Sequence, residues 1–222
     1  MFTRYAVYFT ADGMLGARGA AWLGWDIAMG AAMPQPGLSG IDLAAVTEKP
    51  RRYGFHGTIK PPFALKDELR EDALQAAFGA LCKAVRPVVC EALEVSRLGR
   101  FLALTPVGDA SDLKALAAKV VRDLDCFRAP PTEAELARRR GARLTPAQEE
   151  NLTLWGYPHV MDQFRFHMTL SGRMKDLSEI QETAERYFAP VLARPFRMDS
   201  LTLVGERPDG TFVNIARREL GR

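Results

Sequence analysis

The chain has 222 residues, of which 47% are hydrophobic and 26% charged, and this composition is that of an ordinary globular protein. A formal net charge of only +3 argues against a long nucleic-acid-binding surface. Its three cysteines, Cys82, Cys90 and Cys126, have no Cys-x-x-Cys spacing, which argues against both a disulfide framework and a cysteine-based zinc site.

The N-terminal sequence and the hydropathy pattern favour a cytoplasmic protein. No basic region followed by an apolar segment opens the chain, so we expect no signal peptide. No apolar run approaches the roughly 18 residues that a membrane span requires. We therefore expect no membrane partner.

The first third of the chain predicts a strand, a helix, a loop and a second strand. Residues 4–10 are aromatic and β-branched, which predicts a strand, and residues 14–28 are rich in Ala, Leu and Trp, which predicts a helix. A Pro- and Gly-rich stretch over about residues 30–52 predicts a loop. It leads to a strand at His56, which the prolines at 61–62 should end because proline cannot extend a ladder.

The middle of the chain predicts two helices and two strands. Apolar residues at helical spacing predict helices over residues 71–85 and 111–124. Residues 91–97 and 101–107 are strand candidates. A second histidine-containing strand is expected at about residues 164–171.

The last segments continue the same alternation of helix and strand. A helix is expected at 179–189, and the pattern at 178–181 predicts a capping box at its start. Strand candidates at 196–204 and 211–218 follow, joined by a Pro-Asp-Gly turn.

The order of these elements repeats along the chain. A histidine strand, a helix, a strand, a turn and a strand follow from residue 56, and the same order follows from residue 167. We therefore expect one α+β domain over residues 1–222, made of two pseudo-symmetric β/α lobes at about 1–100 and 101–222. Their antiparallel sheets should face a central cleft.

Residues 126–155 interrupt this repeat. Capping-box patterns at 132–135 and 145–148 predict two short helices around Gly141. This helical insertion lies between strands that should border the cleft. It is therefore either a lid over the cleft or a peripheral helical pair without contact to a substrate.

Two of the three histidines open the same pattern, His56-x-Thr58 and His167-x-Thr169. Because side chains alternate along a strand, each motif offers an imidazole and a hydroxyl on one face. Imidazole titrates near neutral pH, so one histidine can act as base and the other as acid in a displacement at phosphorus. The threonine hydroxyls would hold the phosphate oxygens. The sequence assigns neither the acid nor the base role to a particular histidine.

Three further side chains are expected near these motifs. Strand alternation places Lys60 on the face of the first motif, and Arg165 and Ser171 on the face of the second. A cation there would bind a second phosphate, lower an imidazole pKa or simply reach solvent. His159 has no threonine two positions on, and we expect it to be non-catalytic.

Sequence motifs for other chemistries are absent from the chain. It has no His-Glu-x-x-His or Cys/His cluster for a metal, and no Gly-x-x-x-x-Gly-Lys-Ser/Thr loop for nucleotide phosphates. We therefore expect neither a metal nor a cofactor.

The repeated motif on a duplicated β/α plan resembles the 2H phosphoesterase superfamily, whose signature is two His-x-Thr/Ser motifs. Residues 4–9, 51–63 and 164–172 are similar to a bacterial branch of this superfamily that is encoded beside phosphonate-utilisation genes. The resemblance covers nearly the whole chain apart from the helical insertion.

The resemblance implies that His56 and His167 are catalytic and that Thr58 and Thr169 bind substrate. It implies metal-independent hydrolysis of a phosphodiester or cyclic phosphodiester in a small phosphorylated metabolite, linked to phosphonate metabolism. Two alternatives stay open. One is an RNA-end enzyme acting on 2′-linked phosphodiesters, which the near-neutral charge disfavours. The other is a non-catalytic sensor of a phosphate ligand.

Overall fold

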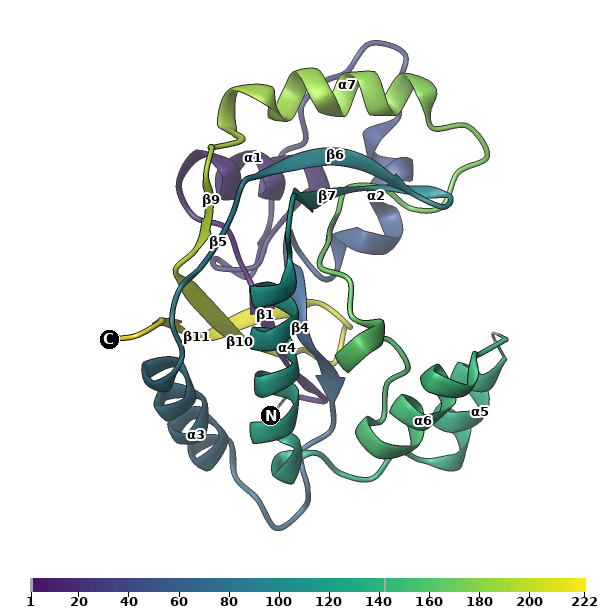
Figure 1. The fold of residues 1–222 in the computed structure, drawn as a ribbon. Coiled ribbons are helices and arrows are strands. Elements are labelled where there is room, and N and C mark those ends of the chain that lie inside the picture. The colour runs from purple at the N-terminus through teal and green to yellow at the C-terminus, as the bar shows by residue number, and fades with distance from the viewer. Residues whose placement is uncertain (1, 142) are drawn as a thin grey trace.

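The computed structural model describes residues 2–141 and 143–222 and has an antiparallel sheet at its centre (Figure 1). Its seven strands are β1 (Tyr5–Phe9), β4 (Gly57–Phe63), β6 (Ala92–Leu98), β7 (Phe101–Val107), β8 (Met168–Thr169), β10 (Ser200–Glu206) and β11 (Phe212–Glu219). They lie in the order β11-β10-β1-β4-β8-β7-β6. Two short pairs lie outside this sheet, β2 (Trp25–Asp26) with β3 (Ala31–Ala32) and β5 (Val88–Cys90) with β9 (Phe196–Met198).

Helices and antiparallel strands share the chain, which confirms the predicted α+β class. The helices are α1 (Gly13–Leu23), α2 (Leu43–Arg51), α3 (Glu71–Ala84), α4 (Ser111–Asp123), α5 (Glu133–Arg140), α6 (Pro146–Trp155) and α7 (Ser178–Phe188). Short 3₁₀ turns cover Asp125–Phe127, Met161–Gln163 and Ala189–Val191. In the described part of the chain, none of the helices has both the length and the apolar character needed to cross a membrane.

The strand order mixes strands from both halves of the chain. β6 pairs with β7, while the C-terminal β10 pairs with β1. The division into lobes at residue 100 stays a prediction.

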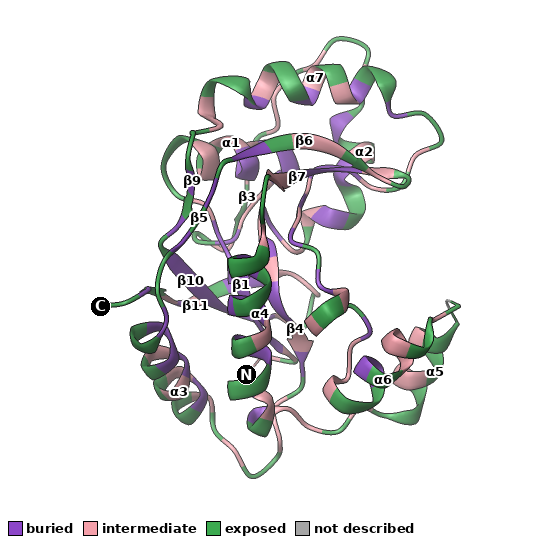
Figure 2. Cartoon of the chain, in the orientation of Figure 1, coloured by how far each residue is buried: buried purple, intermediate pink, exposed green. Residues whose placement is uncertain are grey.

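The larger hydrophobic core lies on one face of the sheet. Tyr5, Val7 and Phe9 of β1 are buried in it together with side chains from α1, α3, α4 and α7. The alternate residues Ala6 and Tyr8 belong to a much smaller cluster on the other face. Figure 2 shows buried residues along the sheet and exposed ones on the outer sides of the helices. The face that carries Tyr8 is therefore the less heavily covered one.

At the centre of the sheet β4 pairs with β8, in register at Gly57 and Met168. A Cβ added to Gly57 would lie 2.3 Å from a ring atom of Phe166, so only glycine leaves room for that ring. On its other edge β8 pairs with Ala103 and Leu104 of β7. The short strand is thus held from both sides.

Helix α2 lies inside the stretch predicted to be a loop, and that prediction was wrong. Asp42 caps its start by accepting a hydrogen bond from the backbone N–H of Ala45 at 3.1 Å. Pro50 lies in its last turn and does not prevent the helix. The helix predicted over 14–28 ends earlier, at Leu23, because Gly24 adopts a left-handed conformation with φ 79°.

Strand β4 does not end at the two prolines, and Lys60 does not face the cavity side of the sheet. The register between β4 and β1 shifts twice, so Tyr8 pairs with Thr58 but Val7 pairs with Lys60. Such a bulge accommodates proline and breaks the alternation of faces. The Lys60 ammonium instead donates to the carbonyl of Val121 in α4 at 3.1 Å. The prediction for Lys60 was wrong for this reason.

The second histidine segment is mostly irregular, because only Met168–Thr169 of the predicted 164–171 forms a strand. Ser171 is buried, and its hydroxyl accepts from the backbone N–H of Leu102 and donates to the carbonyl of Gly172. The Ser171 hydroxyl therefore forms its hydrogen bonds with the backbone and not with the side chains of the second motif.

Capping was predicted correctly in the insertion but not at α7. Thr132 and Thr145 form the two expected capping boxes with Glu135 and Gln148. At α7 the residue before the helix is Leu177, which makes no side-chain cap. In Figure 1 the insertion helices α5 and α6 project to one side of the sheet.

The buried ion pair between Lys60 and Asp125 generates a test of the fold. The Lys60 ammonium lies 3.3 Å from a carboxylate oxygen of Asp125, which also binds Arg128 at 2.7 Å. Burial lowers the pKa of Lys60 to about 8. We expect Asp125→Ala to lower the free energy of unfolding by about 3 kcal/mol, because it leaves a buried charge unpaired.

Lys60→Met removes the charge and keeps an apolar stem, so it should cost less than about 1.5 kcal/mol. Asp123→Ala, at an exposed pair with Lys119, is the control and should cost at most about 1 kcal/mol. Urea unfolding of the three variants measures these differences. A larger cost for Lys60→Met than for Asp125→Ala would contradict this account of the ion pair.

Candidate active site

A cavity of about 1050 Å³ lies over the β4–β8 pairing, on the face of the sheet that carries Tyr8. Both motifs line it: His56 and Thr58 from one, and His167 and Thr169 from the other. Its volume is that of a small-molecule site. The structure thus brings the four predicted site residues together, and their catalytic and binding roles stay predictions.

The strand register sets how the two motifs face each other. In an antiparallel pair centred on Gly57 and Met168, His56 lies opposite Thr169 and Thr58 lies opposite His167. Opposite Cβ atoms are about 4.5–5.5 Å apart, and diagonal neighbours such as the two histidines are roughly 7–8 Å apart. That spacing leaves room for a tetrahedral phosphate between the imidazoles.

Hydrogen bonds fix the orientation of the His56 ring. Its Nδ1 lies 2.9 Å from the carbonyl oxygen of Gly54, and its Nε2 lies 3.0 Å from the hydroxyl of Thr58. A carbonyl only accepts, so Nδ1 carries the proton of the neutral ring. Nε2 then has the free lone pair and accepts from Thr58. The basic nitrogen is therefore the one beside the motif's own threonine.

The surroundings of His56 keep its ring neutral. Tyr8, which is fully buried, stacks on it with ring centroids 3.8 Å apart. Burial lowers the pKa of His56 to about 4, against the opposing hydrogen bond to Gly54, and the nearby His167 lowers the pKa further. At neutral pH His56 is therefore an unprotonated base.

His167 is oriented in the same way as His56. Its Nδ1 lies 2.9 Å from the carbonyl oxygen of Arg165, again two residues earlier in the chain. This bond turns Nε2 away from that carbonyl. The Arg165 side chain lines the cavity, as expected from the sequence. The two motifs thus repeat both their residue types and their backbone contact.

The sequence left open whether the insertion borders the cleft, and in the structure it contributes a wall of the cavity. Arg138 and Arg139 of α5, Gln148 of α6, and Tyr157 and His159 after α6 all line it. The insertion therefore borders the cavity rather than lying apart from it. The run of three arginines in a predicted helix next to the cleft was the available signal.

His159 also lies in this cavity. Burial lowers its pKa, and the neighbouring charges of His167 and Arg139 act in the same direction. Its expected non-catalytic role stays a prediction.

The cavity is strongly basic although the whole chain is nearly neutral. None of its described lining residues is acidic. Six of them are arginines, namely Arg4, Arg52, Arg97, Arg138, Arg139 and Arg165. Among these six arginines, only Arg4 lies within ion-pair distance of a carboxylate in the described ranges, and that carboxylate belongs to Glu206. No group of three or more potential metal-ligating side chains occurs in the same ranges. The charges therefore favour an anionic ligand.

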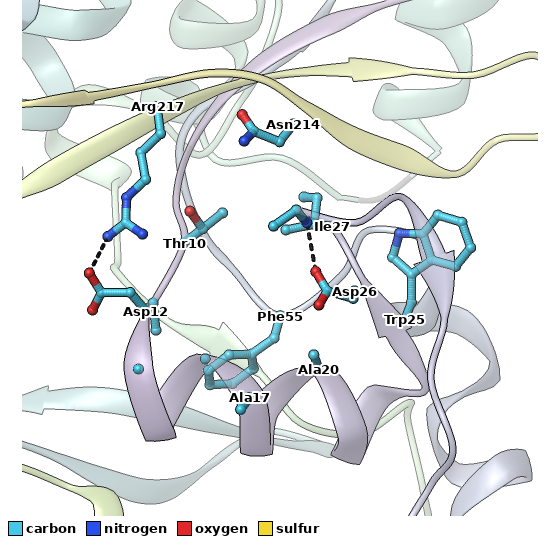
Figure 3. A pocket seen from close by; sticks show the side chains of 14 residues that line it. Thr10, Asp12, Ala17, Ala20, Trp25, Asp26, Ile27, Phe55, Asn214 and Arg217 are labelled. Atoms are coloured by element: carbon cyan, nitrogen blue, oxygen red, sulfur yellow. Dashed lines mark hydrogen bonds and ion pairs between the residues drawn. The ribbon is translucent and has the colours of Figure 1, made fainter.

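A second cavity of about 270 Å³ lies between α1 and β11 and has a different character (Figure 3). Its charged groups bind one another, since Arg217 donates to Asp12 at 2.8 Å. Asp26 accepts from the backbone N–H groups of Ala28 and Met29. No histidine is among its described lining residues. The larger cavity is therefore the candidate site.

Comparison with known proteins relates the chain to one family and to longer proteins. A family model described as "Protein of unknown function (DUF1045)" matches residues 58–213. Two curated proteins named ribose 1,5-bisphosphate phosphokinase PhnN are similar to nearly the whole chain. The protein from Janthinobacterium sp. (strain Marseille) is 38% identical over 97% of this chain, and that from Laribacter hongkongensis (strain HLHK9) is 30% identical over 96%.

The chain spans about half the length of these curated relatives, 50% and 51% respectively. Among solved structures, E. coli LigT complexed with 3′-AMP is similar over 100% of both chains, with 11% identity and a TM-score of 0.46.

The lowered pKa of His56 predicts a pH-dependent stability. The ring takes up a proton near pH 6.5 in the unfolded chain but near pH 4 in the folded one, so the unfolded state binds more protons between these values. Stability should therefore fall as the pH falls through this window. We expect a loss of about 1–2 kcal/mol, less than the full shift implies because the ring is only half-buried.

His56→Gln should remove this contribution and flatten the pH dependence by the same amount. Urea unfolding of both proteins between pH 4.5 and 7.5 measures the difference. Identical pH dependence in the two proteins would show that the His56 ring is not kept neutral by the fold.

Proposed function

The chain belongs to the family described as "Protein of unknown function (DUF1045)", and we propose that it is a metal-independent phosphodiesterase of the 2H type. Its substrate is a cyclic or linear phosphodiester in a small phosphorylated metabolite. The observation that supports this most strongly is the register of β4 and β8, which sets two His-x-Thr motifs side by side in a basic cavity.

In the proposed reaction a water molecule attacks phosphorus, and the bond to the ester oxygen breaks on the opposite side. Nε2 of His56 takes the proton of the water, because its lowered pKa keeps it unprotonated at neutral pH. Nε2 of His167 gives a proton to the leaving oxygen. The products are a phosphomonoester and a free hydroxyl.

The threonines and Arg165 stabilise the charge that develops on the scissile phosphate. Thr58 donates to Nε2 of His56 and is placed to donate to a non-bridging oxygen once substrate is bound. Thr169, opposite His56, supplies the equivalent hydroxyl from the other strand. Arg165, two residues before His167, adds positive charge at the cavity wall.

The names of the curated relatives support a phosphorylated sugar as substrate. Both contain ribose 1,5-bisphosphate, and the sequence resemblance places the family's branch beside phosphonate-utilisation genes. The kinase activity in those names is no part of the proposal, because this chain has no Gly-x-x-x-x-Gly-Lys-Ser/Thr loop and spans half of the relatives. We propose a phosphorylated ribose with a cyclic phosphodiester.

Hydrolysis of a panel of sugar and nucleoside cyclic phosphates in the presence of EDTA tests the proposal. His56→Ala and His167→Ala should each lower kcat by roughly 10²–10⁴-fold, the usual contribution of one acid or base group. His159→Ala is the matched control and should lower kcat by less than about tenfold. Full activity of the His56→Ala/His167→Ala double variant would overturn the two-histidine mechanism.

A further inference from the structure

Arg139 is a half-buried cation in the lining of the cavity. Its Nε is buried and has no hydrogen-bond acceptor among the described residues, while its guanidinium lies 4.6 Å from the ring centroid of Tyr157. Burial lowers the pKa of Arg139, and the charges of Arg138 and Arg4 act in the same direction. Leaving a buried charged donor unpaired is costly, so this group is suited to receive an anion.

A second arginine of the cavity lining, Arg52, also lies against a tyrosine ring. The guanidinium of Arg52 lies 4.7 Å from the ring centroid of Tyr53 and donates to its hydroxyl at 2.6 Å. Arg52 has no carboxylate within ion-pair distance in the described part of the chain. Both arginines and both tyrosines line the same cavity.

These two pairs are supplied by elements other than the His-x-Thr motifs. Arg139 comes from the insertion and Tyr157 from the segment that follows it, whereas Arg52 and Tyr53 come from the segment before β4. The Tyr53 ring lies 6.3 Å from that of His56, so the Arg52–Tyr53 pair adjoins the candidate catalytic centre. The cavity of about 1050 Å³ is far larger than one phosphate group needs.

We infer that Arg139 and Arg52 bind a second phosphate, a phosphomonoester carried by the same substrate as the scissile diester. This inference rests on the proposed function for the position of the first phosphate. A phosphomonoester carries close to two negative charges and three acceptor oxygens, which match two guanidinium forks better than a carboxylate does. The substrate class is therefore a phosphodiester with a separate terminal phosphate.

Two substrates that differ by one phosphate test the inference, namely 2′,3′-cyclic AMP and its 5′-phosphorylated form. We expect the wild-type protein to favour the 5′-phosphorylated form in kcat/KM by roughly 10- to 100-fold, as for hydrogen bonds to a charged group. Arg139→Gln should remove this preference and leave kcat/KM for 2′,3′-cyclic AMP within about threefold of the wild type. Equal loss on both substrates would overturn the inference.

Arg140→Gln is the matched control. Arg140 is the next residue of α5, is exposed, and pairs with Glu149 outside the cavity. This variant should keep the wild-type preference. Loss of the preference in Arg140→Gln would assign the effect to the fold of the insertion and contradict a role for Arg139 itself.

A binding measurement separates this inference from the proposed function. Calorimetric titration with 3′-AMP and with adenosine 3′,5′-bisphosphate compares one phosphate with two and needs no turnover. Tighter binding of the bisphosphate that Arg139→Gln abolishes would support the second site even if neither cyclic substrate were hydrolysed. Equal binding of both compounds by the wild type, including no detectable binding of either, would overturn it.

Discussion

The pairing of β4 with β8 at Gly57 and Met168 is the contact on which the candidate site depends. A slip of one residue in either strand would turn that strand's histidine and threonine to the core face. Apolar packing opposes such a slip, because Met168 is fully buried and the Phe166 ring occupies the space where Gly57 has no side chain. The middle residues of the two motifs thus fix the register, while the histidines and threonines are the residues to which we assign the chemistry.

The charges of the cavity follow a consistent pattern. The imidazole of His56 is kept neutral by burial and by the stacked ring of Tyr8, while arginines from several elements remain positive around it. A neutral base and a surrounding positive field suit attack on an anionic phosphate, because the field stabilises the phosphate without protonating the base. The net charge of +3 for the whole chain does not reveal that arginines are concentrated around this cavity.

Sequence reasoning succeeded where the information is local in the chain. Periodic apolar residues predicted α3 and α4, and the repeated motif pointed to the four residues that now share one cavity. It failed for Lys60, because a bulge depends on the partner strand and alternation along β4 does not reveal it. It left open whether the insertion is a lid or a peripheral helical pair, because the position of α5 against the cavity is set by tertiary packing.

A crystal structure with orthovanadate, a mimic of the phosphoryl transition state, tests most directly whether the two motifs act on one phosphorus atom. The account predicts vanadate between the Nε2 atoms of His56 and His167, with the hydroxyls of Thr58 and Thr169 within hydrogen-bond distance of its oxygens. Vanadate in contact with only one of the two motifs, or bound elsewhere in the cavity while the motifs stay empty, would contradict it.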